Sequence, residues 1–478
     1  MKRIVVKENS IQQGSSDYIR DYLLSVGIPA HLVNAFKEVP ADIYEDDPFK
    51  LDNIQEGLKV VKEMMDRGVK TFIQVDSDPD GFTSAIFIQY FKRRYPNNEF
   101  IWRLQPGKEH GVVPSTVPAD CELVIIPDAG SVQYAEQEEL TNAGKTVVVL
   151  DHHNIDEYKK INNVTIINNQ MGTFPNKCLC GAGVVYMFIK AFDFTYYPDE
   201  EPIYKDYMDL TALGLISDMM DTRAVGNHYI IYHGLKNIKN KMFLALLNKQ
   251  AFSINKISKV EDPSKYAIAF YITPVINGLI RSGEQEEKEL LFRGMITPES
   301  DEQIEHTFRG KTTLEDIYTR AARLAANAKG RQDAGKKKSL EFLNTKIEQE
   351  HLNDNKVLTI CLDDNETKKV DQNITGLAAM AVLNQYNKPA LVLRHRVEDG
   401  KDLFCGSGRS KDFYGFRSLM KFIRESGLSC FTQGHDNAFG AWFEADKIPE
   451  WNKYCNEKLA SFDFEDCYEV DYYFHKAS

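Results

Sequence analysis

The sequence lacks any long apolar run, and its eight cysteines form no repeated motif. No stretch approaches the ~20 apolar residues that cross a membrane, and the apolar part of the N-terminus MKRIVVKENS is too short for a signal peptide. Cys178 and Cys180 lie too close together for a zinc-knuckle pair, and no CxxC occurs. We therefore expect a cytoplasmic protein with free thiols and no membrane segment.

An excess of positive charge is also missing. Lys and Arg number 58 against 70 Asp and Glu, which gives a net charge of −12. This balance argues against a protein that holds nucleic acid by bulk charge, although a local basic patch could still bind it. The 478 residues, 43% of them hydrophobic, suffice for two or more domains with sizeable cores.

Short apolar segments alternate with helical patterns in the first half of the chain. A helix is expected around Ser16–Val26 and another within 51–68, where Gly68 ends it. Residues 181–250 are expected to be mostly helical. The candidate strands are Thr71–Val75, Leu123–Pro127, Thr146–Leu150 and Val164–Ile167, and helices are expected over Thr83–Arg94 and Val132–Ala143. Buried strands that alternate with helices predict an α/β fold with a parallel sheet.

A second α/β block begins near residue 355. Its candidate strands are Val357–Leu362, Pro389–Arg394, Leu403–Gly406 and Ala438–Phe443. Between the blocks, Leu314–Glu350 has few helix breakers and predicts a long helix. Its Arg320–Lys338 stretch carries seven basic residues and one acidic residue. This stretch is either a solvated linker or a surface that faces a polyanion.

Acidic side chains follow three consecutive candidate strands. They are Asp76, Asp78 and Asp80 (VDSDPDG), Asp128 (IIPDAGS), and Asp151 with His152 and His153 (VVLDHHN). The carboxyl ends of parallel strands share one edge, which is the usual ligand site of such sheets, so we expect these groups to converge. Asp218 in the otherwise apolar LGLISDMMD is a fourth candidate, because an acid there is costly unless it is paired or bound to metal.

Carboxylates with one or two imidazoles suit Mn²⁺ or Mg²⁺, and this set could hold two ions. Two ions would activate a water and stabilise the leaving oxygen of a phosphoester. Each Asp alone has an ordinary alternative as a turn or helix-capping residue. Three successive strands that all end in Asp nevertheless favour a metal-dependent phosphoesterase.

VDSDPDG, PDAGS, DHHN and LGLISDMMD, in this order, resemble the four motifs of the DHH phosphoesterase superfamily. CGSGRSKDFYGFRSLM and FTQGHDNAFGAWF resemble its DHH-associated substrate-binding domain. The stretches DIYEDDPFKLDNIQEGLKVV, RLQPGKEHGV, ITPVINGLIR and ITGLAAMAVLNQYNKPALVL resemble the bacterial RecJ single-strand DNA exonucleases.

The resemblance implies an α/β fold in which a parallel-sheet DHH domain is joined by a long helix to a smaller α/β DHH-associated domain. The expected divisions are an N-terminal extension (1–50), the DHH catalytic domain (51–305), a helical linker (306–352), the associated domain (353–446) and a C-terminal tail (447–478).

The resemblance also implies roles for individual residues. The implied metal ligands are Asp76, Asp78, Asp80, Asp128, His152 and Asp218, and the implied catalytic group is Asp80, Asp128, His152, His153 and Asp218. Asp76 is either a ligand or a supporting group, and Asp151 is expected to orient a histidine. The implied contacts to substrate phosphates are His153, Asn277, Arg281, Ser407, Gly408, Arg409, Gly434 and His435.

The sequence departs from the RecJ pattern in three places. Val275 stands where the pattern has Arg, and Gln433 replaces the first glycine of Gly-Gly-His. Too few residues follow Phe443 for the OB-fold domain of larger RecJ proteins, so its stacking and charge contacts to DNA are expected to be missing. The resemblance thus implies a compact RecJ-like nuclease.

Our leading hypothesis is a two-metal (Mn²⁺ or Mg²⁺) 5′-to-3′ exonuclease that hydrolyses single-stranded DNA in repair, recombination or replication. We expect a monomer, in a bacterium or acting for a virus in a bacterial host. A single-strand-binding or replication protein is a further candidate partner. Two alternatives stay open: an oligoribonuclease or small-nucleotide phosphodiesterase of the same superfamily, and an inactive DHH scaffold that binds replication proteins.

Overall fold

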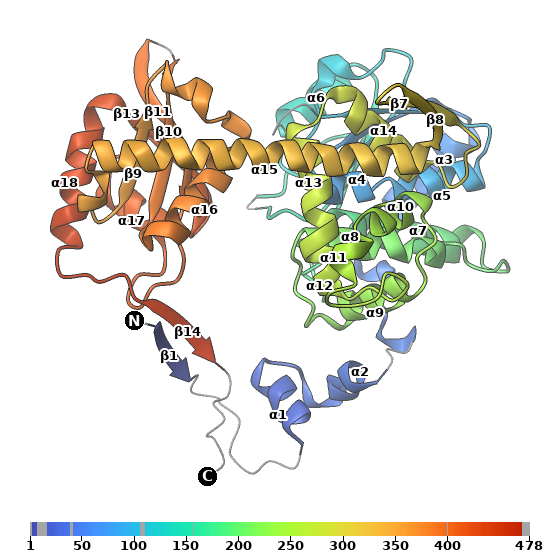
Figure 1. Cartoon of the computed structure of the whole chain (residues 1–478). Coiled ribbons are helices and arrows are strands. Elements are labelled where there is room, and N and C mark those ends of the chain that lie inside the picture. The colour runs from blue at the N-terminus through green and yellow to red at the C-terminus, as the bar shows by residue number, and fades with distance from the viewer. Residues whose placement is uncertain are drawn as a thin grey trace. The chain divides into compact units, whose positions relative to one another are not determined.

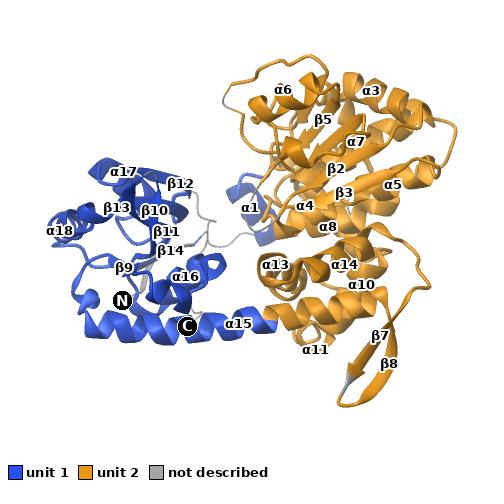
Figure 2. Cartoon of the chain, turned by 90° about the horizontal axis from the view of Figure 1, so that it is seen from above, with its two compact units in different colours: residues 1–28, 330–478 blue, residues 29–329 orange. Residues whose placement is uncertain are grey.

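The computed structural model describes residues 2–6, 17–38, 42–105, 110–155, 157–398 and 400–470. The chain divides into two compact units, which Figure 2 colours separately. We call residues 29–329 the larger unit, and residues 1–28 with 330–478 the smaller unit. In the described ranges, no helix is long and apolar enough to span a membrane.

The larger unit is built on a parallel sheet with the strand order β3-β2-β4-β5-β6. The strands are β2 (Thr71–Val75), β3 (Phe100–Leu104), β4 (Leu123–Pro127), β5 (Thr146–Asp151) and β6 (Val164–Asn168). All but β3 confirm strands that the apolar runs predict. The edge strand β3 is additional, because Arg103 interrupts its apolar pattern.

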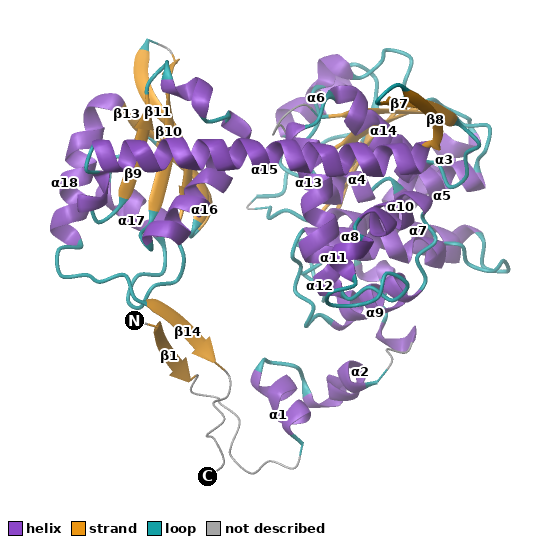
Figure 3. Cartoon of the chain, viewed as in Figure 1, coloured by secondary structure: helices purple, strands orange, loops and turns teal. Residues whose placement is uncertain are grey.

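Apolar side chains alternate between the two faces of this sheet. Val147 and Val149 lie in one core, whereas Val148 and Leu150 lie in the other. Successive side chains of a strand point to opposite faces, so helices must cover both. Figure 3 colours the helices purple and the strands orange. The helices of the larger unit are α2 (Val33–Lys37), α3 (Ile54–Asp66), α4 (Pro79–Thr83), α5 (Ile86–Arg94), α6 (Tyr134–Asn142), α7 (Gly181–Tyr196), α8 (Met208–Ser217), α9 (Val225–Lys236), α10 (Lys241–Lys249), α11 (Ala251–Ile254), α12 (Lys265–Ala267), α13 (Thr273–Ser282) and α14 (Gln285–Ile296).

The helix expected over Thr83–Arg94 is present as α5 (Ile86–Arg94), and the short helix α4 precedes it. α4 begins earlier, at Pro79, because the Asp78 side chain accepts a hydrogen bond from the Gly81 amide at 2.9 Å and caps the first turn. This early start places an acidic turn directly at the end of β2.

The smaller unit has a five-stranded mixed sheet with the order β12-β13-β11-β10-β9. The strands are β9 (Leu358–Leu362), β10 (Ala390–Glu398), β11 (Lys401–Arg409), β12 (Phe431–His435) and β13 (Ala438–Glu444), and only β9–β10 is a parallel pair. All but β12 confirm predictions. Helices α16 (Thr375–Tyr386), α17 (Leu419–Ser426) and α18 (Ile448–Lys458) accompany this sheet, whose core includes the fully buried Trp451.

The smaller unit also contains both ends of the described chain. The helix expected around Ser16–Val26 is present as α1 (Tyr18–Ser25). Strand β1 (Lys2–Val6) pairs in parallel with β14 (Asp466–Val470), with Lys2 opposite Asp466 and Val6 opposite Val470.

A single long helix, α15 (Ile317–Gln349), begins in the larger unit and ends in the smaller one (Figure 1). It confirms the helix predicted over Leu314–Glu350, except at its start. Leu314 belongs instead to a hairpin, β7 (Gln303–Phe308) and β8 (Lys311–Asp316). Asp316 ends the hairpin and accepts a hydrogen bond from the Thr319 amide at 2.8 Å, so it caps the new helix.

Candidate metal centre and phosphate-binding residues

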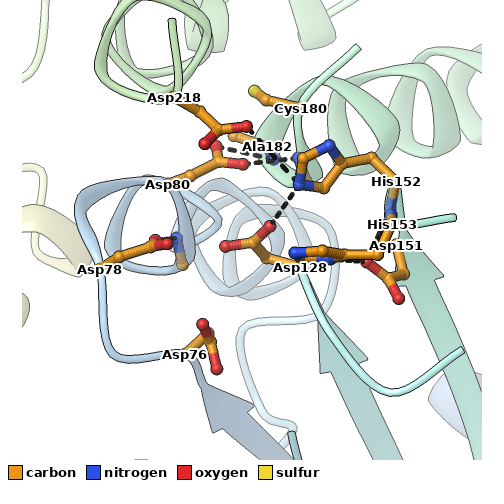
Figure 4. Close-up of polar contacts among 12 residues, drawn as sticks. Asp76, Asp78, Asp80, Asp128, Asp151, His152, His153, Cys180, Ala182 and Asp218 are labelled. Carbon is orange, nitrogen blue, oxygen red and sulfur yellow. Dashed lines mark hydrogen bonds and ion pairs between the residues drawn. The ribbon is translucent and has the colours of Figure 1, made fainter. Parts of the chain in front are cut away.

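The acidic side chains predicted to converge lie together at the carboxyl edge of the parallel sheet (Figure 4). Asp76 follows β2, Asp128 follows β4, and Asp151 is the last residue of β5. Asp218 comes from outside the sheet, at the C-terminal end of α8. Three sets of these residues place one ligand atom each within 4.8 Å of one another: Asp76, Asp78 and Asp128; Asp80, His152 and Asp218; and Asp128, Asp151, His152 and His153.

Asp128 is the most strained and least satisfied member of the group. It is 1% exposed, and its backbone has φ = 63°, a left-handed conformation that is costly for a residue with a side chain. Among the described residues, neither carboxylate oxygen has a hydrogen-bond partner. His152 Nε2 lies 3.2 Å from Oδ1. Burial and then the charge of Asp80 raise the pKa of Asp128 well above its usual range.

The N-terminus of α7 holds Asp80. Its Oδ2 accepts a hydrogen bond from the Gly181 amide at 2.6 Å, and Oδ1 accepts one from the Ala182 amide at 3.2 Å. Helix N-termini favour negative charge, yet burial still raises the pKa of Asp80. Burial and then Asp80 raise the pKa of Asp218 to about 7. Asp218 Oδ2 lies 3.6 Å from His152 Nε2.

Two glycines let these carboxylates pack against helices. A Cβ at Gly181 would lie 2.4 Å from Asp128 Cβ, and a Cβ at Gly214 would lie 2.5 Å from Asp80 Oδ1. Neither position could carry a larger side chain without displacing an acid. Gly181 and Gly214 were not singled out from the sequence, because their role depends on a contact across the fold.

Asp76 and Asp151 each support a histidine. Asp76 Oδ2 lies 2.7 Å from His110 Nδ1 and so raises the pKa of His110. Asp151 Oδ1 lies 2.8 Å from His153 Nδ1, and this hydrogen bond raises the pKa of His153 to about 9. The Ser131 amide donates to Asp151 Oδ2 at 3.0 Å. Sequence reasoning missed His110, although it lies in the quoted stretch RLQPGKEHGV.

Asn277 and Arg281 also lie in the larger unit, both half-buried on α13. The hydrogen bond to Asp76 raises the pKa of His110, and the charge of Arg281 opposes this with a smaller effect. Val275, which stands where an Arg was expected, is 5% exposed and belongs to the apolar core. Its side chain therefore offers no polar contact to a ligand.

The remaining predicted residues gather in the smaller unit, on neighbouring strands. Arg409 of β11 and His435 of β12 both pair with Ala438 of β13, so the two side chains share one row and one face of the sheet. Ser407 lies two residues before Arg409 and faces the same way. Gly408 and Gly434 form the adjacent row, opposite Phe439.

The first turn of α16 positions Ser407 and Arg409. Thr375 Oγ1 lies 3.0 Å from Ser407 Oγ, and a Cβ at Gly376 would lie 2.4 Å from Arg409 Nη2. Arg409 Nη1 donates to the Gly408 carbonyl at 2.7 Å, and burial lowers the pKa of Arg409. The guanidinium thus packs against Gly376, and its planar array of N–H donors suits bidentate binding of phosphate.

The chain resembles known proteins in sequence. The family model "DHH family, N-terminal domain" matches residues 70–215. The SPbeta prophage-derived protein YorK of Bacillus subtilis (strain 168), whose assigned activity is that of a single-strand DNA-specific exonuclease, is 34% identical over 428 residues, which cover 88% of this chain and 72% of that protein.

Two solved structures have the same fold. RecJ from Thermus thermophilus in complex with Mn²⁺ aligns with a TM-score of 0.66 at 18% identity, over 98% of this chain and 64% of that chain. A second structure, exonuclease RecJ bound to manganese, aligns with a TM-score of 0.61 at 20% identity, over 87% of this chain and 96% of that one.

Proposed function

The chain belongs to the DHH family, among its RecJ-like single-strand DNA-specific exonucleases, and we propose that it removes nucleotides from the 5′ end of single-stranded DNA with two divalent cations. The observation that carries the proposal is the buried Asp128 carboxylate. Both of its oxygens lie among other acids without a hydrogen bond from the described residues. A cation is the partner that would satisfy such a group.

The donor set fits Mn²⁺ or Mg²⁺. Carboxylate oxygens with a single imidazole, His152, are the ligands that hard divalent ions prefer. Asp76, Asp78 and Asp128 form one candidate site, and Asp80, His152 and Asp218 form a second. Bound at these sites, the ions would supply Lewis-acid chemistry: polarisation of a phosphate oxygen and activation of a water.

The chain's own residues would hold and orient the substrate. Asp151 fixes His153 through Nδ1 and leaves Nε2 as the nitrogen for the scissile phosphate. Asn277 and Arg281 would bind phosphates in the larger unit. In the smaller unit, Arg409, Ser407 and His435 would bind a further phosphate of the strand. We propose a role in DNA repair, recombination or replication for a monomer in the cytoplasm of a bacterial cell, where a single-strand-binding or replication protein is a candidate partner.

The test offers the purified protein with Mn²⁺ four labelled substrates: single-stranded DNA, duplex DNA, short RNA and a cyclic dinucleotide. We expect mononucleotides to be released from single-stranded DNA alone, and from its 5′ end. Asp80→Ala should abolish release. Asp120→Ala is the matched control, because Asp120 is an exposed acid of the same unit that pairs with Lys70 at 2.6 Å.

Rapid turnover of the cyclic dinucleotide with intact single-stranded DNA would contradict the proposal in favour of a small-nucleotide phosphodiesterase. No turnover of any substrate, together with binding of a replication protein, would favour an inactive scaffold.

A further inference from the structure

One continuous helical segment, Lys265–Ser282, packs directly on the elements that carry the acids. It consists of α12, a π-helical turn over Ile268–Ile272 and α13 (Figure 1). The π turn contacts α8, which ends at Asp218, and α13 contacts both α8 and α4, which carries Asp80. π turns within helices frequently occur at functional sites.

The outer face of this segment combines aromatic rings with polar groups. Tyr266 is 61% exposed and Phe270 is 69% exposed, and Asn277 and Arg281 are half-buried on the same side. They are four, seven and four residues apart, which is close to one or two helical turns, and they are exposed or half-buried, so together they form one stripe along the segment. We call these four residues the outer stripe. Arg281 belongs to α13, which packs on α4, the helix that carries Asp80.

The aromatic end of the stripe is also joined to the acid cluster. Lys265 Nζ donates to Thr222 Oγ1 at 3.1 Å, and Thr222 lies in the segment that leaves Asp218. The same ammonium lies 5.5 Å from the centre of the Tyr266 ring. A cation therefore stands beside an exposed aromatic face, close to the chain that continues from a candidate metal ligand.

The charge of the segment favours a polyanion as its occupant. Between Lys265 and Gly283 the sequence has two basic residues and no acidic one, although the whole chain has a net charge of −12. Exposed rings flanked by cations are how proteins hold single strands without reading their sequence, because every base has a face on which a ring can stack. A protein partner would use the rings but gain less from this local charge.

We propose that the outer stripe binds the part of the single strand that continues beyond the scissile phosphate, with Phe270 and Tyr266 stacking on its bases. The inference rests on the proposed function and names the surface that holds the strand. Phe270 precedes Arg281 by about 16 Å of helix at 1.5 Å per residue, which corresponds to about five nucleotides at the 3.4 Å stacked spacing. Tyr266 lies about one further turn away.

This length makes the test specific. The double variant Tyr266→Ala/Phe270→Ala is assayed with 5′-phosphorylated dT3 and dT12 in Mn²⁺. For dT12 we expect KM to rise about tenfold or more, with kcat within about twofold, since stacking on each base typically contributes a fivefold or larger effect. For dT3, which is too short to reach Phe270, KM should stay within about twofold of wild type.

Matched variants separate stacking from other effects. Phe270→Tyr keeps an aromatic ring and should retain the wild-type KM for dT12. Phe270→Leu keeps an apolar side chain without a π-face, so its KM for dT12 should rise as much as that of Phe270→Ala. Phe194→Ala is the control for loss of an exposed ring. Phe194 is 44% exposed with Lys190 Nζ 5.8 Å from its ring, and it lies at the end of α7 opposite to the end that holds Asp80.

Anisotropy titration of labelled dT12 in EDTA measures the same stripe without cleavage. A tenfold weaker Kd for the double variant, with wild-type affinity for Phe194→Ala, would support the stripe even if the wild type cut nothing, and the latter result would overturn only the proposed activity. Equal effects on dT3 and dT12, or unchanged KM and Kd, would overturn the inference. A change in elution volume on size exclusion with unchanged Kd would also overturn it, and would assign the rings to a protein interface.

Discussion

Replacing Asp128 by Asn should stabilise the metal-free protein while destroying its use of metal. Asp128 is fully buried, and both of its oxygens lack a hydrogen bond from the described residues. One oxygen each of Asp76, Asp78 and Asp128 lies within 4.8 Å of the others. Asn has nearly the same shape without the charge, so the change removes repulsion and leaves the packing in place.

The size of the gain follows from that spacing. Two unit charges 4.8 Å apart repel by about 3.5 kcal/mol at an effective dielectric constant of about 20. Shared protons within the cluster and the weakened contact with His152 Nε2, 3.2 Å from Asp128 Oδ1, reduce this, so we expect the free energy of unfolding in EDTA to rise by about 1–3 kcal/mol. For a unit of this size, the melting temperature should rise by roughly 2–6 °C.

Differential scanning calorimetry in EDTA and in excess Mn²⁺ measures both halves of the prediction. Metal at 100 times its Kd should stabilise the wild type by about 2.7 kcal/mol, and the transition that Mn²⁺ shifts identifies the larger unit. Asp128→Asn should lose that shift. The variant should therefore be more stable than the wild type in EDTA and less stable than the wild type in excess Mn²⁺. Exonuclease activity should fall at least about 100-fold.

Asp193→Asn is the matched control with the opposite expected sign. Asp193 is equally buried, but its oxygens accept hydrogen bonds from Arg94 at 2.6 Å, the Ile203 amide at 2.8 Å and the Tyr204 amide at 2.9 Å. Its neutralisation should cost about 2 kcal/mol, because it weakens the hydrogen bond and ion pair to Arg94, which keeps Glu200 as its other acidic partner. The reasoning is refuted if Asp128→Asn melts at or below the wild-type temperature in EDTA while Asp193→Asn is destabilised.

Two further substitutions probe the close contacts. Gly181→Ala should weaken Mn²⁺ binding and lower kcat at least about tenfold, because its Cβ would lie 2.4 Å from Asp128 Cβ. Mn²⁺ titration by calorimetry and a kinetic assay measure the two effects. The control Gly330→Ala, which has open space around its Cβ, should change neither. Gly376→Ala should raise KM for 5′-phosphorylated single strands about tenfold with little change in Mn²⁺ affinity, because its Cβ would displace the Arg409 guanidinium; a wild-type KM would show that Arg409 does not bind the strand.

The positions of four strands of the larger unit and the meeting of the acidic residues that follow three of them could be predicted from the sequence, because they depend on local signals. Apolar runs mark β2, β4, β5 and β6, and parallel pairing brings their carboxyl ends to one edge. β3 and β12 carry weaker signals than the other strands of their sheets. β3 contains Arg103, and most side chains of β12 are exposed and of mixed composition, so neither run is apolar enough to stand out.

The supporting contacts of the site could not be predicted, because they join residues that are distant in sequence. Gly181 touches Asp128, and Asp80 depends on an amide about one hundred residues further along the chain. His110 lies within a stretch that resembles RecJ, yet its bond to Asp76 joins residues 34 positions apart in the sequence. Such pairings are set by tertiary packing, for which a single sequence carries no period or spacing.

The pairing of β1 with β14 imposes an order on folding during synthesis of the chain. These strands lie almost the whole chain apart in sequence, so at 5–20 residues per second β1 waits roughly 23–93 s after its own synthesis before its partner exists. During that time its backbone donors and acceptors are an open edge. Residues 29–329 are complete much earlier and can fold as a unit meanwhile. If synthesis ends before Asp466, the truncated chain can therefore assemble its acid cluster while its first strand is still free to pair with another molecule.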